Sequence, residues 1–587
     1  MCEHEEANTF VIPRIITGLI LFGLGYVFNP LFLVAYLIVG ADVLLRAIKN
    51  ILKGQIFDEN FLMSLATVGA ICIKEFPEAV MVMILYQIGE YMQDKAVDKS
   101  KNSIAALMDI RPDYANLNGK KVSPSEVKIG DIITIKTGEK IPLDGVVVSG
   151  KASLDTSALT GEALPRSVDI GDEVISGCIN LNGVLEVKVT KPFGESTVAK
   201  ILELVENASS KKAKTENFIT KFARYYTPAV VIIACIIACI PPFYIERALT
   251  FLVISCPCAL VISIPLSFFA GIGGASSKGI LIKGSSYIEI LSKAKVAIFD
   301  KTGTLTKGNF KVVEISSDNP DLLRYTAFAE AVSPHPIAEA IREAYKEKYN
   351  AEIPTNNEIE EIAGYGIKAK IEGKEILVGN ANFINTTPVN KAGTVVHVAI
   401  DGVYQGYIVI ADTIKDDTKS AIEALRKLGL KTEMLTGDSE TTAQNVAAEI
   451  GIDEYHAELL PNDKVERLEN AIASSKGSVI FVGDGINDAP VLTRADVGIA
   501  MGGLGSDVAI ESADVVIMDD KPSKVALAIK MAKKTMLIAK ENIVFALAIK
   551  LLFLIFGGLG FVSMWGAVFA DVGVSIIAIL NALRASK

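Results

Sequence analysis

Asp300-Lys-Thr-Gly-Thr-Leu-Thr306 is the stretch that decides the fold of this 587-residue chain. It follows the apolar run Val296-Ala-Ile-Phe299, which predicts a buried parallel strand. Asp300 then stands at the carboxyl end of that strand, where open α/β sheets place their chemistry. A carboxylate there can attack a phosphoryl group and form an aspartyl-phosphate. Thr302 and Thr304 can offer hydroxyls and backbone N–H groups to the phosphate. A single Asp would more often cap a turn, but the complete heptapeptide favours the nucleophile.

Three later motifs extend this phosphoryl-transfer site, and each follows an apolar or strand-like run. They are Leu435-Thr436-Gly437-Asp438, Pro461-Asn462-Asp463-Lys464 and Val482-Gly483-Asp484-Gly485-Ile486-Asn487-Asp488. The first offers a hydroxyl and N–H groups to a phosphate, and the second offers a lysine charge. The third sets two carboxylates on a Gly-rich loop, whose hard oxygens suit Mg²⁺ together with phosphate oxygens. Each motif alone is weak and typical of a turn, whereas the ordered set is specific.

The four motifs together resemble those of P-type ATPases, the cation pumps, and their haloacid-dehalogenase-like phosphorylation domain. The resemblance implies that Asp300 is the nucleophile and Lys464 a phosphate ligand. It places Thr436 and Asp438 in the catalytic site. It also implies a Mg²⁺ site made by Asp300, Thr302 and Asp484, with Asp488 supporting the loop.

Two further stretches resemble parts of the same family. Thr160-Gly-Glu-Ala-Leu-Pro165 is similar to the actuator loop, with Ala163 where the family usually has Ser. Glu162 would then orient the water that hydrolyses the aspartyl-phosphate. A turn Glu is the alternative that the loop alone does not exclude.

A segment from Lys307 to Ala411 is inserted between the halves of the phosphorylation domain, and it resembles the nucleotide-binding domain of heavy-metal P-type ATPases. On that resemblance Glu330 and His335 contact the adenine end of ATP, while Gly364 and Gly366 let the backbone approach the nucleotide. Thr302 is assigned to the same bound ATP. Pro334 departs from the family, which more often has Glu there.

Composition favours a chain that is part membrane and part soluble. Charged residues make up 21% of it, and the mean hydropathy is +0.39. The formal charge of −10 argues against nucleic-acid binding. Paired apolar runs with Lys or Arg at their inner flanks predict about eight transmembrane helices with both termini cytoplasmic. Most of the seven Cys lie in apolar runs, which argues against disulfides.

The predicted fold class is a polytopic α-helical membrane protein with three cytoplasmic domains: an all-β actuator, an α/β phosphorylation domain and an α+β nucleotide-binding domain. The predicted boundaries are a tail at 1–10, four transmembrane helices at 11–99, the actuator at 100–214, helices five and six at 215–285, the phosphorylation domain at 286–306 with 412–528, the nucleotide-binding domain at 307–411, and helices seven and eight at 529–587.

The transported ion is inferred from the membrane segments. Cys256-Pro257-Cys258 lies deep in an apolar run, where a mid-helix proline would kink the helix and splay two thiols towards one point. Soft sulfur ligands select Cu⁺, Zn²⁺ or similar metals, and the Cys-Pro-Cys arrangement resembles heavy-metal-transporting (class IB) P-type ATPases. Two buried cysteines acting as small apolar residues are the alternative.

Lys550 and Asp571 each lie inside an apolar run, where ionisable residues are costly and usually functional. Two thiolates and the Asp571 carboxylate suit Zn²⁺. Lys550 would balance the remaining charge and act as a built-in counter-ion when the metal leaves. Both residues resemble the Zn²⁺/Cd²⁺/Pb²⁺ subgroup rather than the Cu⁺ subgroup.

Three acidic features remain open. Glu78 is predicted to accept the metal on the release path, and Glu90 either forms an entry funnel or is a charge at a helix end. The start Cys2-Glu-His-Glu-Glu6 is interpreted as a disordered acidic tail, with weak metal capture as the alternative. The soluble metal-binding domain that often precedes the first span is either absent or was removed.

We therefore expect a plasma-membrane pump, monomeric and multi-pass, that uses Mg²⁺ and ATP to export Zn²⁺, Cd²⁺ or Pb²⁺. The alternatives are a Cu⁺ pump, a membrane-anchored haloacid-dehalogenase-type phosphatase and a metal receptor without turnover. The sequence does not rank the three divalent metals, and it leaves proton counter-transport open.

Overall fold

The computed structural model describes residues 11–53, 59–108, 112–157, 165–200, 212–241, 244–255, 257–333, 335–354, 358–362, 365–389, 391, 393–484, 488–502 and 511–586. The chain divides into two compact units. One comprises Met1–Ser292 with Ile529–Lys587, and the other is Lys293–Ala528.

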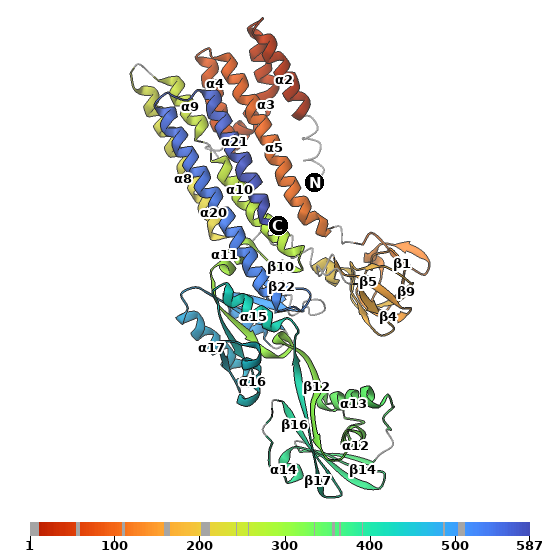
Figure 1. Cartoon of the computed structure of the whole chain (residues 1–587). Helices are drawn as coiled ribbons and strands as arrows, with labels where there is room; N and C mark the ends of the chain where they lie inside the picture. Colours follow the sequence, from red (N-terminus) through yellow and green to blue (C-terminus); the bar gives the residue numbers. More distant parts are fainter. Residues whose placement is uncertain are drawn as a thin grey trace. The chain divides into compact units, whose positions relative to one another are not determined.

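The first unit contains a bundle of long helices (Figure 1). Its helices are α2 (Val11–Gly25), α3 (Pro30–Leu52), α4 (Glu59–Cys72), α5 (Phe76–Met108), α8 (Lys214–Cys239), α9 (Ile245–Ile254), α10 (Cys258–Ser276), the later part of α20 (Ser523–Gly558) and α21 (Met564–Ala582). Pro30 occupies the first turn of α3, where its missing N–H costs nothing. The Asn29-Pro30 pair thus stands at the start of α3, at the end of the turn that separates it from α2.

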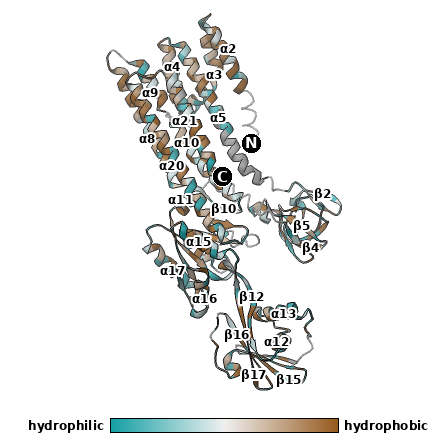
Figure 2. Cartoon of the chain, in the orientation of Figure 1, coloured by the Kyte–Doolittle hydropathy of each residue, from teal (hydrophilic) through white to brown (hydrophobic). Residues whose placement is uncertain are grey.

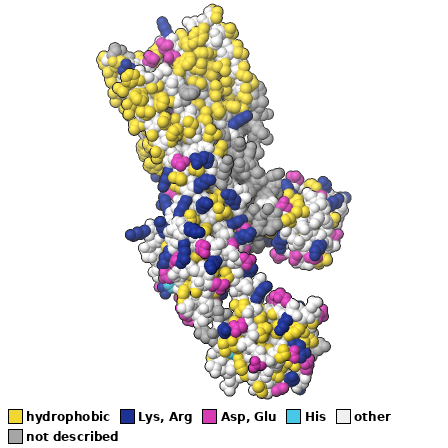
Figure 3. All heavy atoms as spheres, viewed as in Figure 1, with side chains coloured by type: hydrophobic (Ala, Val, Ile, Leu, Met, Phe, Trp, Pro, Cys, Tyr) yellow, Lys and Arg dark blue, Asp and Glu magenta, His cyan; other side chains and the backbone are white. Residues whose placement is uncertain are grey.

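The bundle is apolar both inside and outside. Its core includes Leu62, Met83 and Val253, while Ile20 and Leu551 are among many large apolar side chains exposed on its surface. Figures 2 and 3 show brown helices and a nearly continuous hydrophobic face over the bundle, whereas charged side chains are scattered over the other domains. Such a large exposed apolar surface is typical of a lipid-facing protein.

Three described segments are long and apolar enough to cross a membrane: Pro30–Leu52, Ile245–Ser276 and Met564–Ser586. Shorter apolar helices are Val11–Gly25, Asn60–Cys72 and Tyr225–Cys239. The count of eight spans stays a prediction.

The predicted all-β domain consists of short strands between α5 and α8. One sheet has the order β2-β1-β3-β9-β4-β7 and the other the order β6-β5-β8. The strands are β1 (Ala115–Leu117), β2 (Lys120–Val122), β3 (Ile132–Ile135), β4 (Gly145–Ser149), β5 (Ala152–Asp155), β6 (Arg166–Val168), β7 (Glu173–Val174), β8 (Ile179–Asn180) and β9 (Leu185–Val189). Alternation along β9, with Leu185, Val187 and Val189 buried, explains why this stretch forms a strand with one face on the core.

The second unit is built on a parallel sheet with the order β22-β21-β20-β11-β18-β19. Its strands are β11 (Ala294–Asp300), β18 (Lys431–Leu435), β19 (Glu454–His456), β20 (Ser478–Gly483), β21 (Val497–Met501) and β22 (Val515–Ile517). The connecting helices are α15 (Thr418–Lys427), α16 (Glu440–Ile450), α17 (Pro461–Ser474) and α18 (Ala489–Arg494). Such crossovers are what parallel pairing requires. Val296, Ile298 and Phe299 on β11 are buried, in agreement with the predicted buried strand.

The inserted domain is an antiparallel sheet with the order β12-β17-β16-β15-β14-β13. Its strands are β12 (Thr306–Ser317), β13 (Glu358–Ile362), β14 (Gly366–Ile371), β15 (Lys374–Gly379), β16 (Thr394–Ile400) and β17 (Val403–Ile414). Helices α12 (Leu322–Ala329) and α13 (Pro336–Tyr349) pack on this sheet through a shared apolar core. The paired strands β12 and β17 carry the chain out of the parallel-sheet domain and back into it.

Candidate functional site

The predicted nucleophile lies at the centre of the parallel sheet. β11 pairs with β18 on one side, with Asp300 opposite Leu435, and with β20 on the other, with Phe299 opposite Val482. Because parallel strands end at the same edge, the motifs that follow Leu435 and Val482 meet at Asp300. Three separated motifs are thus brought to one edge by sheet register.

Lys464, in the first turn of α17, bridges two of these carboxylates. Its Nζ lies 2.6 Å from Asp300 Oδ1 and 2.9 Å from Asp488 Oδ1. Asp300 and Asp488 are both buried. The predicted phosphate ligand therefore lies beside the predicted nucleophile, and Asp488 contacts the lysine directly rather than only supporting its loop.

The site holds more negative than positive charge. Burial raises the pKa of Asp300 to about 7, and the charges of Asp488 and Asp484 add to this effect against the opposing Lys464 ammonium. Burial likewise raises the pKa of Asp488. An added cation would stabilise the ionised carboxylates, so the donor set fits Mg²⁺. Among the described residues, no group of three acidic, His or Cys side chains is arranged to hold a metal ion.

The loop after Asp300 is shaped for a phosphate. Gly303 has φ +72°, a conformation that other residues rarely adopt, and a Cβ there would lie 3.6 Å from Asp484 Oδ2. The Thr304 hydroxyl is buried and finds no hydrogen-bond partner within the described part of the chain. Since an unsatisfied buried hydroxyl costs about 1–3 kcal/mol, Thr304 is suited to donate to a bound phosphate.

The residues of the Thr436–Asp438 motif already have protein partners. The Asp438 backbone N–H donates to Thr436 Oγ1 at 3.1 Å. The Asp438 carboxylate forms an ion pair with buried Lys301. Asp438, Thr302 and Lys301 line one cavity of about 540 Å³ between the parallel sheet and the inserted domain. Thr302 thus lies where a nucleotide could reach the site.

Lys415 is a site residue that the sequence interpretation missed. Its buried Nζ donates to the Gly303 carbonyl at 2.7 Å and lies 2.7 Å from Asp520 Oδ1. Nearby, the Thr306 hydroxyl donates to the Asp412 carboxylate. Asp412 and Lys415 lie where the chain returns from the insert, shortly after the apolar run Ile408-Val-Ile410. Charged residues at this return point were the sequence signal that could have identified them as site residues. These contacts attach Gly303 and Thr306, within and just after the loop that follows Asp300, to the returning strand.

The predicted adenine-binding residues gather in the inserted domain. Glu330, His335 and Gly366 line one cavity of about 330 Å³. Thr394 lines both this cavity and the one beside Thr302. Gly366 has φ +151°, and a Cβ there would lie 2.1 Å from the Val378 carbonyl oxygen, so only glycine fits. Gly364 lies outside the described residues.

His335 also serves as the N-cap of α13, because its Nδ1 accepts the Ile337 N–H at 3.2 Å. His335→Asn would preserve a cap acceptor while removing the imidazole. We expect this variant to keep its thermal stability and its maximal rate, with the KM for ATP raised about three- to tenfold by the loss of one ligand contact. Steady-state kinetics and a thermal melt measure the two effects.

His335→Ala is the matched comparison, and it should additionally lose about 1 kcal/mol of stability because it lacks the cap. An unchanged KM for ATP in His335→Asn would show that the imidazole only caps the helix.

The predicted ion-site charges meet in the helix bundle. Lys550 on α20 and Asp571 on α21 are both buried and form an ion pair. Lys550 Nζ also donates to the Ile254 carbonyl at 3.3 Å. Ile254 is the last residue of α9, where helix carbonyls lose their intrahelical partners. Charges that lie 21 positions apart in sequence are therefore neighbours.

The proline of the Cys-Pro-Cys motif begins a helix rather than kinking one. α9 ends at Ile254, and Pro257 is the N-cap of α10, which starts at Cys258. The expected mid-helix kink is thus a break between two helices, at the chain end of α9 that Lys550 contacts. Cys256 and the Cys258 side chain lie outside the described residues, so their position relative to Asp571 stays a prediction.

Three predicted acidic residues remain: Glu78, Glu90 and Glu162. The side-chain Oε2 of Glu78, in the first turn of α5, is buried and has no hydrogen-bond partner among the residues described. Glu90 instead forms an ion pair with Arg46, so its carboxylate is already occupied. Glu162 of the actuator-like loop lies outside the described residues.

Known families match two parts of the chain. The haloacid dehalogenase-like hydrolase family matches residues 294–496, and the P-type ATPase actuator domain matches residues 113–206. The first match spans the inserted domain and the parallel sheet from β11 to α18, and the second spans the strands of the all-β domain between α5 and α8.

Whole proteins are similar over nearly the full chain. A cadmium, zinc and cobalt-transporting ATPase of Bacillus subtilis is 56% identical over 582 residues, covering 95% of this chain and 83% of that protein. A zinc-transporting ATPase of Synechocystis is 54% identical, covering 94% and 80%. A crystal structure of a zinc-transporting PIB-type ATPase in the E2.Pi state is 34% identical, with a TM-score of 0.64 and 99% of both chains covered.

Proposed function

The chain belongs to the heavy-metal-transporting (class IB) P-type ATPases of the zinc and cadmium subgroup, and from this premise we propose how its own residues carry out the reaction. It couples ATP hydrolysis to the export of Zn²⁺ or Cd²⁺ across a membrane. The steps of that cycle fall to residues of the parallel-sheet domain, the actuator-like loop and the helix bundle.

Asp300 is the nucleophile. One carboxylate oxygen attacks the γ-phosphorus of ATP, the bond to the β–γ bridging oxygen breaks, and ADP leaves. Lys464 Nζ, 2.6 Å from Asp300 Oδ1, is placed to neutralise the transferred phosphoryl group. The Thr304 hydroxyl, buried and unpartnered within the described chain, would donate to it.

Mg²⁺ fits this arrangement, with Asp300 and Asp484 as the protein ligands. When bound, it would neutralise charge on the phosphoryl oxygens. The Asp300 carboxyl, whose pKa is raised by burial and further by the nearby Asp488 and Asp484 carboxylates, supports this assignment. Thr302 borders the same cavity and would contact the nucleotide.

Glu162 is assigned to the hydrolysis of the aspartyl-phosphate. In this proposal its carboxylate orients a water that attacks the phosphorus of the aspartyl-phosphate, which releases phosphate and restores the Asp300 carboxylate. The resemblance of Thr160–Pro165 to the actuator loop supports this role, together with the actuator-domain match over residues 113–206.

The cation is held in the bundle by the Cys256 and Cys258 thiolates and by Asp571, with Glu78 on the release path. The observation that carries this proposal is the buried pair of Lys550 and Asp571, which lies at the break between α9 and α10. In the metal-free protein the ammonium neutralises Asp571, so Lys550 can replace the departing cation. The apolar segments support a location in a membrane, which we take to be the plasma membrane, and the Lys and Arg residues at their inner ends support cytoplasmic soluble domains.

The test is ATP hydrolysis by purified protein in lipid, titrated with Zn²⁺, Cd²⁺, Pb²⁺, Cu⁺ and no added metal. Stimulation by the divalent ions is the expected result, and their order ranks the substrates. Stimulation by Cu⁺ alone would contradict the assignment of Asp571 and Lys550 to the cation site.

A further inference from the structure

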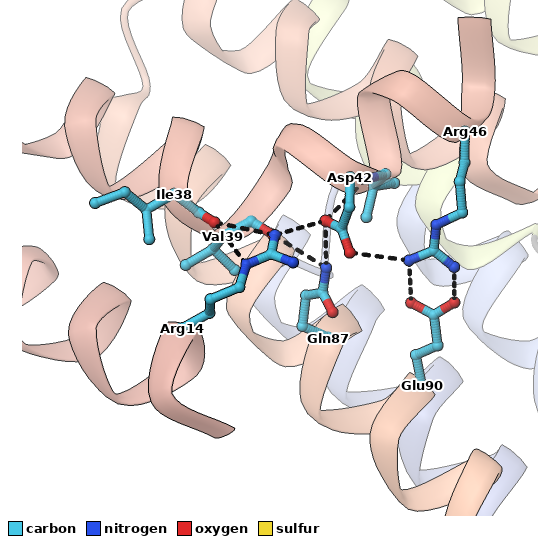
Figure 4. Close-up of polar contacts among 8 residues, drawn as sticks. Arg14, Ile38, Val39, Asp42, Arg46, Gln87 and Glu90 are labelled. Carbon is cyan, nitrogen blue, oxygen red and sulfur yellow. Dashed lines mark hydrogen bonds and ion pairs between the residues drawn. The ribbon is translucent and has the colours of Figure 1, made fainter. Parts of the chain in front are cut away.

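A second group of charges links helices α2, α3 and α5 of the bundle, through side chains that are 22–42% exposed (Figure 4). Arg14 on α2 reaches Asp42 on α3, with 2.9 Å between Nη2 and Oδ1. Arg46, one turn further along α3, contacts Asp42 Oδ2 at 3.1 Å and forms an ion pair with Glu90 of α5. We call these four residues the α3 charge network.

The α3 charge network has no net charge, because its two arginines balance Asp42 and Glu90. Each carboxylate oxygen accepts at least one hydrogen bond: Asp42 Oδ1 from Arg14, Gln87 and the Val43 N–H, Asp42 Oδ2 from Arg46, and both Glu90 oxygens from Arg46. Gln87 is buried and also donates to the Val39 carbonyl at 3.0 Å. Within these described helices, every carboxylate oxygen of the network is therefore occupied by a protein donor.

Helix α5 connects the network to the helix that carries Asp571. Gly89, the residue before Glu90, faces α21, since a Cβ there would lie 2.8 Å from Val572 Cγ2. Val572 follows Asp571 directly. Helix α5 therefore contacts α21 beside Asp571 with one face and carries Glu90 to Arg46 with another.

The carboxylates of Glu90 and Asp571 differ in how their basic partners contact them. Arg46 contacts Glu90 through two nitrogens and Asp42 through one of them, which is the bidentate grip of a permanently charged guanidinium. Among the described residues, Asp571 is contacted by one ammonium group, that of Lys550. An ammonium is a compact point charge that exchanges more readily with a metal than a bidentate guanidinium does.

We propose that Arg46 is a specificity-determining residue that keeps Glu90 and Asp42 from binding the transported cation, so that Asp571 supplies the carboxylate of the cation site. Free carboxylates in an apolar bundle would attract a divalent cation and slow its passage. On this inference Glu90 is a capped carboxylate and not an entry ligand. The inference rests on the proposed site at Asp571.

The test is the number of Zn²⁺ ions bound per protein in lipid, together with Zn²⁺-stimulated ATP hydrolysis. Arg46→Gln is expected to bind one additional Zn²⁺ and to turn over on the order of tenfold more slowly at saturating Zn²⁺. Arg46→Gln/Glu90→Gln should lose the additional ion and recover most of the rate. A purely structural role for Arg46 predicts no such recovery.

Arg14→Gln is the matched control, because it removes the same charge from the network but leaves Arg46 on both carboxylates. It should bind no additional Zn²⁺. If Arg46→Gln does not fold, Arg46→Lys keeps the charge with a weaker grip and should show a smaller gain of Zn²⁺.

Two results would overturn the inference. One is an Arg46→Gln or Arg46→Lys variant that binds and turns over Zn²⁺ as the parent does. The other is a folded Glu90→Gln variant that no longer transports, since Glu90 would then be a ligand. Zn²⁺ retained by Asp571→Ala would instead contradict the proposed cation site, and the comparison of Arg46 with Arg14 would still be informative.

Discussion

Asp300→Asn is expected to abolish phosphoenzyme formation and to lower metal-stimulated ATP hydrolysis by at least about 10⁴-fold. The amide nitrogen and oxygen of Asn cannot replace the attacking carboxylate, and the neighbouring Asp488 carboxylate is held by Lys464. The measurement is acid-stable incorporation of phosphate from γ-labelled ATP, with hydrolysis followed in parallel.

The same change should make the phosphorylation domain more stable. Burial and neighbouring carboxylates raise the pKa of Asp300 to about 7, so the folded protein disfavours its ionised form near neutral pH. A neutral Asn removes this unfavourable charge, while Lys464 keeps Asp488 as its partner. We expect a gain on the order of 1 kcal/mol in thermal unfolding without Mg²⁺.

Glu162→Gln provides the contrast. It should form the phosphoenzyme and accumulate it, because only the hydrolytic water loses its base. Residual phosphoenzyme in Asp300→Asn, or an unphosphorylated Glu162→Gln variant, would contradict the roles assigned to these two carboxylates.

Asp571→Ala is expected to have the second-largest effect, a loss of metal-stimulated hydrolysis of at least about 100-fold. It removes the carboxylate ligand and leaves the Lys550 ammonium buried beside the Ile254 carbonyl without its counter-charge on α21. Breaking a buried ion pair on one side typically costs about 3–5 kcal/mol. The melting temperature in detergent and Zn²⁺-stimulated hydrolysis measure the two losses.

A double variant separates the two losses. Lys550→Met/Asp571→Leu replaces the pair with apolar side chains of similar size, which is often neutral for stability. It should recover the melting temperature but not the response to Zn²⁺. Zn²⁺-stimulated turnover in a folded Asp571→Ala protein would contradict the assignment of Asp571 to the cation site.

The sequence alone was sufficient to predict the family and most of the architecture. The heptapeptide at Asp300 and the motifs ending at Asp438, Lys464 and Asp488 each depend on a few adjacent residues, and the apolar run before Asp300 forms the buried strand that it predicts. Family membership and the export of Zn²⁺ or Cd²⁺ were confirmed by similar proteins that cover nearly the whole chain, whereas Pb²⁺ stays a prediction. The roles of individual site residues stay predictions.

Only the tertiary structure decided which charges meet. Asp300 and Lys464 are 164 positions apart, and Arg46 and Glu90 are 44 apart, so no local pattern connects them. Glu90 looked open to a cation in the sequence because its partner lies on another helix. Lys415 was missed for the same reason, because it is 112 positions away from its partner Gly303 in the sequence and the inserted domain lies between them. Local motifs depend on neighbouring residues, whereas the pairing of buried charges depends on how distant helices and strands pack.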